Sequence, residues 1–212
     1  MNNMLQTFIP KKISIYSLLI SNILPLVGVF FFHWDIFSLL FLYWFETTII
    51  GILNVIKIIY STRYHKMIRG YFLVPFFCFH FGGFLFGHLF LLLFFFSPMG
   101  LFGDNTINFY QTPQIISSVS FQVLFSILAL AFSHILSFIK NYLGEKEYIF
   151  FPPDKQMGRP YQRVIIMHLT ILFGGIYLMS YGSSFFGIIL LIVLKTFFDL
   201  RSHLKSHAFK KL

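Results

Sequence analysis

Long apolar segments alternate with short polar ones along this chain. Six windows have the roughly 20 residues that a helix needs to cross the hydrocarbon core of a bilayer. They fall at 13–32, 36–60, 71–96, 114–139, 162–181 and 185–204. The pattern predicts an all-α, single-domain bundle of six transmembrane helices over residues 1–212. The short links at 33–35 and 181–184 predict antiparallel neighbours on either side of each link.

The basic residues all fall toward one side of these six segments. The sixteen Lys and Arg residues are Lys11, Lys12, Lys57, Arg63, Lys66, Arg69, Lys140, Lys146, Lys155, Arg159, Arg163, Lys195, Arg201, Lys205, Lys210 and Lys211. The segments expected on the other side, 33–35, 97–113 and 181–184, contain neither Lys nor Arg. Cytoplasmic loops carry an excess of Lys and Arg. We therefore expect a multi-pass protein of the cytoplasmic membrane with both termini in the cytoplasm.

The composition excludes an ordinary soluble domain, because 57% of residues are hydrophobic and only 11% are charged. The formal net charge of +9 lies beside apolar spans and accompanies no nucleic-acid motif. We interpret it as a sign of topology and of attraction to anionic lipid headgroups, with no nucleic-acid partner. The single cysteine, Cys78, excludes an intrachain disulfide. The sequence identifies no protein partner.

The polar residues within the apolar segments are the candidates for a functional site. A charged side chain at the centre of a membrane helix costs about 2.5 to 3.5 kcal/mol, so such residues usually face the bundle interior. Glu46 lies near the middle of the second segment. At about 100° per residue, one arc of that helix carries Tyr43, Glu46, Thr47, Gly51, Asn54 and Lys57. We predict that this stripe faces inward and that Glu46 meets His80 or Lys57.

Histidines occur in the next three segments and at the end of the sixth. The third segment carries His80 and His88, with a Gly83-x-x-x-Gly87 pattern between them. Small residues at this spacing allow two helices to approach closely. His134 lies in the fourth segment and His168 in the fifth. The sixth carries the row Lys195, Asp199 and His203.

Depth below the cytoplasmic boundary orders these residues. At about 1.5 Å per residue, we expect His134, His168 and Asp199 at about 3 to 6 Å. His80 and Lys195 should lie at about 10 Å, and Glu46 at about 15 Å. His203 lies at the interface. The polar groups should therefore gather in the cytoplasmic half of the bundle, leaving the other half with little besides His88.

Imidazole nitrogens and carboxylate oxygens are the ligands that Zn²⁺ takes in tetrahedral sites. The predicted metal ligands are His80, His134, His168, Asp199 and His203. Glu46 would be the catalytic general base that activates a metal-bound water. The leading hypothesis is a metal-dependent membrane hydrolase, with Zn²⁺ or another divalent metal, acting on a lipid or another amphipathic substrate that enters between helices. Haem is less favoured. A chain of two haems across the membrane needs a second pair of histidines near the outer face, and only His88 lies there.

Two other classes of function remain open from the residues alone. In the first, Glu46 and the histidines bind protons or a cation in a coupled transporter. In the second, the protein is a structural membrane subunit, and its histidines make hydrogen bonds between helices worth about 0.6 to 2 kcal/mol each. The row Lys195, Asp199 and His203 also fits a salt bridge that leads into a solvated basic tail.

Three segments carry a resemblance to a known family. They are the Tyr-Trp-Phe-Glu run at 43–46, the segment 80–88 that begins and ends with histidine, and the segment 194–203. Together with 22–27 and 163–175, they resemble an uncharacterised family of bacterial and archaeal multi-pass membrane proteins, defined only as a domain of unknown function. The resemblance implies a single complete domain. It implies no activity, cofactor or site residue.

Overall fold

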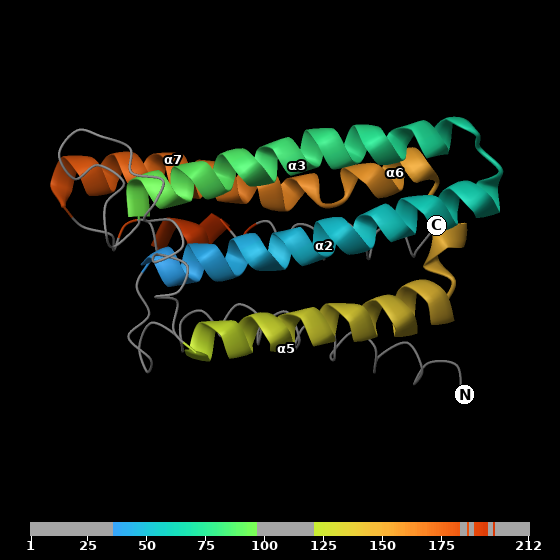
Figure 1. Cartoon of the computed structure of the whole chain (residues 1–212), viewed down its shortest axis with the longest axis horizontal. Coiled ribbons are helices and arrows are strands. Elements are labelled where there is room, and N and C mark those ends of the chain that lie inside the picture. The colour runs from blue at the N-terminus through green and yellow to red at the C-terminus, as the bar shows by residue number, and fades with distance from the viewer. Residues whose placement is uncertain (1–35, 97–120, 183–185, 187–188, 195–196, 198–212) are drawn as a thin grey trace, which may run out of the picture.

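Four long helical spans lie side by side in the computed structural model (Figure 1). The structure describes residues 36–96, 121–182, 186, 189–194 and 197. Its elements are α2 (Ile36–His65), α3 (Arg69–Phe96), α5 (Phe121–Ser137), a π-helix (Phe138–Gly144), a 3₁₀-helix (Glu147–Ile149), α6 (Pro153–Gly158) and α7 (Tyr161–Tyr181). Among the described residues there is no strand, which confirms the predicted all-α class. The predicted helix at 13–32, and much of that at 185–204, lies outside them.

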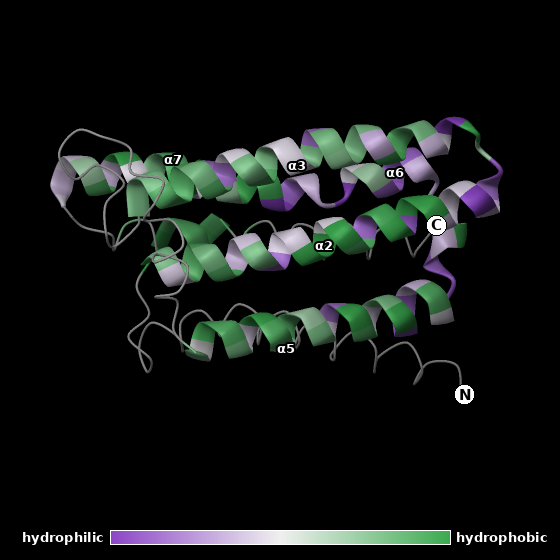
Figure 2. Ribbon diagram, in the orientation of Figure 1, coloured by the Kyte–Doolittle hydropathy of each residue, from purple (hydrophilic) through white to green (hydrophobic). Residues whose placement is uncertain are grey.

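Each of the four spans is apolar enough to cross a membrane. The candidate spans are Ile36–His65, Arg69–Phe96, Val123–Gly144 and Pro153–Tyr181. Figure 2 shows hydrophobic residues along their length and hydrophilic ones gathered at one end of the bundle, at the α2–α3 turn and around α6. The segments from the end of α2 to the start of α3 and from the π-helix to the end of α6 carry the exposed basic residues Arg63, Lys66, Arg69, Lys140, Lys146, Lys155 and Arg159. The described part of the chain thus has the charge distribution of a membrane protein.

The segment between α5 and α7 differs from the prediction. The predicted helices at 114–139 and 162–181 leave residues 140–161 as a polar loop, too short to bury a core of its own. Instead, α5 continues into the π-helix, and α6 with α7 makes one span, Pro153–Tyr181. Pro153 stands in the first turn of α6, where proline is favoured because its missing N–H would have no helical partner. The prolines therefore begin a helix here.

This connecting segment is attached to α2 by hydrogen bonds. Tyr142 Oη donates to the carbonyl of Lys57 (2.7 Å), Ser61 Oγ to the carbonyl of Phe151 (2.6 Å), Gln156 Nε2 to Asn54 Oδ1 (2.6 Å) and His65 Nε2 to the carbonyl of Tyr148 (3.1 Å). Gln156 is only 1% exposed and Asn54 only 3%. Such pairing is required, because a buried amide without partners destabilises the fold. The contacts fix where α7 begins relative to α2.

Glycines set the closest approaches of α3 to its neighbours. A Cβ at Gly51 of α2 would overlap the ring of Phe81, and one at Gly175 of α7 would lie 2.5 Å from the ring of Phe95. Small residues at such positions bring membrane helices into contact. The sequence predicted this role for Gly83 and Gly87. A Cβ on either would meet no atom within 4 Å, so among the described residues they pack against no helix.

Candidate functional site

The predicted polar stripe of α2 faces the bundle interior. Tyr43, Glu46, Thr47, Gly51 and Asn54 are buried, and Lys57 is half-buried. The helical period places these residues on one arc, while Ile52 and Ile56 on the opposite side are exposed. The prediction of the inward face is confirmed.

Glu46 contacts two basic side chains from two other helices. Its Oε2 lies 2.9 Å from Arg163 Nη1 of α7, and its Oε1 lies 3.1 Å from His134 Nε2 of α5. Glu46 is only 7% exposed. Because a guanidinium keeps its charge in proteins, Arg163 gives the buried carboxylate a permanent positive partner. The two contacts seen here are thus with residues other than His80 and Lys57, which the sequence suggested.

Arg163 also lies over an aromatic ring of α2. The guanidinium carbon is 5.5 Å from the centroid of the Tyr43 ring, within the range of a cation–π contact. Tyr43 and Glu46 are one helical turn apart, so both face the same guanidinium. We call Tyr43, Glu46, His134 and Arg163 the Glu46 cluster. It joins α2, α5 and α7 through one buried charge.

The expected depths explain why the sequence did not reveal this cluster. The windows 114–139 and 162–181 placed Arg163 next to the cytoplasmic boundary and His134 about 10 Å nearer the membrane surface than Glu46. Both placements took the helices to end near 139 and to resume near 162. The π-helix Phe138–Gly144 and α6 (Pro153–Gly158) lengthen the two spans, so both side chains lie further from the span ends than expected. The missed signal was the proline-initiated helix before α7.

The remaining histidines of the described region pair between α3 and α7. His80 Nδ1 is 2.8 Å from the Tyr161 hydroxyl, and His88 Nε2 is 3.2 Å from His168 Nδ1. His88, which the sequence analysis left aside, is 2% exposed and the most buried of these four side chains. The structure therefore gives His88 a partner that the depth argument had placed elsewhere.

These pairs keep the predicted metal ligands apart. His80, His134 and His168 each contact a different partner. In the described part of the chain, no group of three or more His, Cys, Asp or Glu side chains could hold a metal ion. Asp199 and His203 lie outside the described residues. A metal site that includes them stays a prediction.

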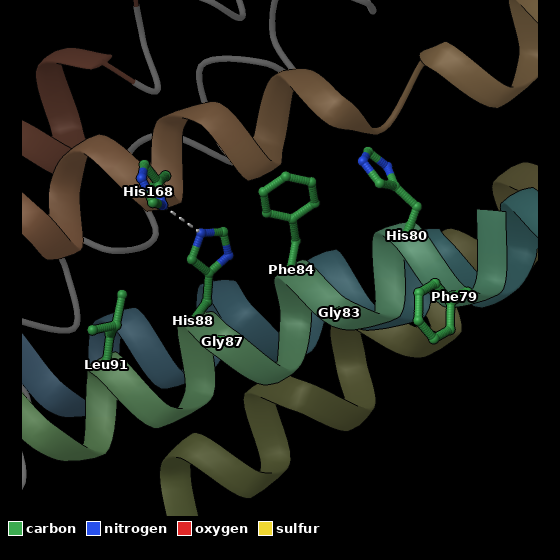
Figure 3. Close-up of a pocket in the computed structure, with 8 residues that line it drawn as sticks. All are labelled: Phe79, His80, Gly83, Phe84, Gly87, His88, Leu91 and His168. Carbon is green, nitrogen blue, oxygen red and sulfur yellow. Dashed lines mark hydrogen bonds between the residues drawn. The ribbon is translucent and has the colours of Figure 1, made fainter. Parts of the chain in front are cut away.

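A pocket of about 360 Å³ lies beside these histidines. Its lining residues are Phe79, His80, Gly83, Phe84, Gly87, His88, Leu91 and His168. Figure 3 shows Phe84 between His80 and His88 on α3, with the His88–His168 hydrogen bond crossing to α7. The ring centroid of Phe84 is 5.1 Å from that of His80 and 6.2 Å from that of His88. The pocket thus joins aromatic walls to three imidazoles.

Comparison with known proteins supports the resemblance found in the sequence. The chain matches the model of a family of unknown function, DUF6498, over residues 5–211. No curated protein matches it. No solved structure matches it either. Because the family model covers nearly the whole sequence, this chain belongs to DUF6498, a family of unknown function.

Proposed function

We propose that this protein is a proton-coupled transporter of the cytoplasmic membrane and that the Glu46 cluster binds the proton. The observation that carries the proposal is a buried carboxylate held by one permanent cation and one titratable group. Glu46 contacts Arg163 at 2.9 Å and His134 at 3.1 Å. The side chain of His134 is 27% exposed and that of Glu46 only 8%, so the imidazole is the more accessible of the two groups.

Protonation of His134 changes the net charge of the cluster. Arg163 and the Glu46 carboxylate together are neutral, and they stay so because guanidinium does not lose its proton. A neutral His134 leaves the cluster uncharged, whereas a protonated one makes it positive. An added charge is costly inside a membrane protein. Proton binding therefore shifts the equilibrium between helix arrangements that expose the cluster differently to water.

Helix α5 is the element best placed to respond. Among the four described spans it has the smallest buried share, and its main partner is α2. His134 ties it to Glu46 of that helix. Protonation of His134 alters this hydrogen bond, which is the main polar contact seen between α5 and α2. Helix α7 stays attached to α2 through Arg163 and Glu46. Movement of α5 relative to α2 would link proton binding to transport.

The same contacts favour transport over hydrolysis. A general base needs an oxygen within hydrogen-bond reach of the water that it deprotonates. Both carboxylate oxygens of Glu46 face basic groups, one from His134 and one from Arg163. Both oxygens are therefore already engaged by other side chains. These contacts therefore favour a transporter over a hydrolase that uses Glu46 as its catalytic base.

Proton flux through liposomes containing the purified chain tests the proposal. We expect flux under an imposed potassium diffusion potential, and a loss of about tenfold or more in Glu46→Gln and in His134→Gln, because the first removes the carboxylate that holds the imidazole and the second removes the proton-exchanging group. An internal pH-sensitive dye reports the flux. His80→Gln is the matched control, since His80 contacts Tyr161 instead of the cluster. Flux equal to that of protein-free liposomes, or unchanged in both cluster variants, contradicts the proposal.

A metal-dependent hydrolase is the second candidate. Its support is the pocket wall that carries His80, His88 and His168, because neutral imidazoles are ligands for Zn²⁺ or another divalent metal. Asp199 or His203 would complete the set of metal ligands. A haem is the less favoured cofactor. Mass spectrometric metal analysis of the purified chain should then give about one metal ion per chain, reduced in His80→Ala and His168→Ala. Metal-free wild-type protein that remains folded removes this candidate.

Orientation completes the proposed function. The basic end of the bundle faces the cytoplasm and contacts anionic headgroups, because exposed Lys and Arg gather there. A reporter enzyme fused after Leu212 should be active on the cytoplasmic side, and one inserted near Asn105 on the opposite side. If the two reporters gave the reverse result, the orientation would be wrong. The contacts of the Glu46 cluster would be unaffected.

A further inference from the structure

The pocket between α3 and α7 shares no residue with the Glu46 cluster, so its role goes beyond the proposed function. Gly83 and Gly87 form an open strip along α3, since a Cβ on either would meet no atom within 4 Å. Phe84 and Leu91 stand beside this strip. The volume of about 360 Å³ lies within the range of small-molecule sites.

The pocket also has an unused polar atom. His88 uses Nε2 to meet His168. Its Nδ1 is buried and has no hydrogen-bond partner among the described residues, although the side chain is 2% exposed. Figure 3 shows this nitrogen turned away from His168 and toward Phe84. A buried polar atom without a partner destabilises the fold. A ligand with a polar atom at this end of the pocket would supply that partner.

A second hydrogen-bonding group stands two helical turns away. His80 and His88 are eight residues apart on α3, which is about 12 Å along the axis. The Phe84 ring stands between these two imidazoles (Figure 3), with its centroid 5.1 Å from that of His80 and 6.2 Å from that of His88. A ligand that meets both imidazoles therefore passes beside Phe84, along Gly83 and Gly87, with a polar atom at each end of an apolar body.

The lining restricts the ligand further. Among the described residues that line it there is no Lys, Arg, Asp or Glu, so none of these side chains balances a phosphate or carboxylate group. Phe79 and Phe84 supply aromatic faces, which favour a planar ring. Phe79 is 88% exposed on a candidate membrane span, and this side of the pocket opens toward the lipid. An uncharged ring with an apolar tail fits these conditions.

We infer that this pocket binds the headgroup of a membrane quinone. The ring lies along the strip of Gly83 and Gly87, with one oxygen toward His80 and the other toward the His88–His168 pair. An imidazole donates to a quinone carbonyl or accepts from a quinol hydroxyl, so the site takes either form. The apolar tail leaves past Phe79 into the bilayer. The inference concerns binding alone.

Titration of the purified full chain with decylubiquinone tests this assignment by isothermal calorimetry. Gly83→Leu and Gly87→Leu fill the pocket where no described atom obstructs a side chain. Each should weaken binding by about tenfold or more, the equivalent of about 1.4 kcal/mol. Gly82→Leu is the matched control, because Gly82 is equally unobstructed on the same helix and does not line the pocket. It should bind as the wild type does.

A second variant separates loss of binding from loss of folding. His80→Leu removes one hydrogen-bonding end without filling the strip, and it should also weaken binding by about tenfold, because one hydrogen bond is lost. Size-exclusion chromatography and helical circular dichroism verify each variant. The inference is overturned if the wild type shows no saturable binding, if folded Gly83→Leu and Gly87→Leu bind normally, or if dodecanoic acid binds in place of the quinone.

Discussion

The buried carboxylate of Glu46 is the constraint on which the arrangement of the bundle depends. An ionised group in a membrane interior needs charged partners, and Glu46 takes them from two helices that lie far from it in sequence. Arg163 attaches α7, and His134 attaches α5. Tyr43 supports the same guanidinium from one turn away. Three of the four described spans are thereby held in one register, at a point where a shift along any helix axis would leave a charge without its partner.

The other contacts between the helices follow from the properties of the surrounding lipid. Lipid gives apolar helices little reason to associate, so close packing and hydrogen bonds determine which surfaces meet. Gly51 and Gly175 allow the rings of α3 to contact both neighbours. The pair Gln156 and Asn54 attaches the segment before α7 to α2. That attachment sets the depth of α7 and so brings Arg163 to the level of Glu46. The glycine contacts and the polar contacts therefore support one arrangement.

Much of the fold could be predicted from the sequence, and less of the site. Hydropathy located the four described spans, and helical periodicity identified the inward stripe around Glu46, since both depend on local spacing. The partners of Glu46 depend on depth, and depth depends on where neighbouring helices end. Arg163 was placed at the very start of a helix, next to the membrane boundary, because nothing in the apolar pattern showed that Pro153 begins a helix that continues into the span. The expected depths also separated His88 from His168, although the two side chains are in contact.

A double-mutant cycle on Glu46 and Arg163 tests the central claim most directly. The free energy of unfolding is measured for the wild type, Glu46→Gln, Arg163→Gln and the double variant in mixed micelles. Each single variant should lose about 3 to 5 kcal/mol, because one charge stays buried without its partner. The double variant should be more stable than the sum of the losses predicts, with a coupling energy of about 1 to 3 kcal/mol. Additive losses within about 0.5 kcal/mol would contradict the account.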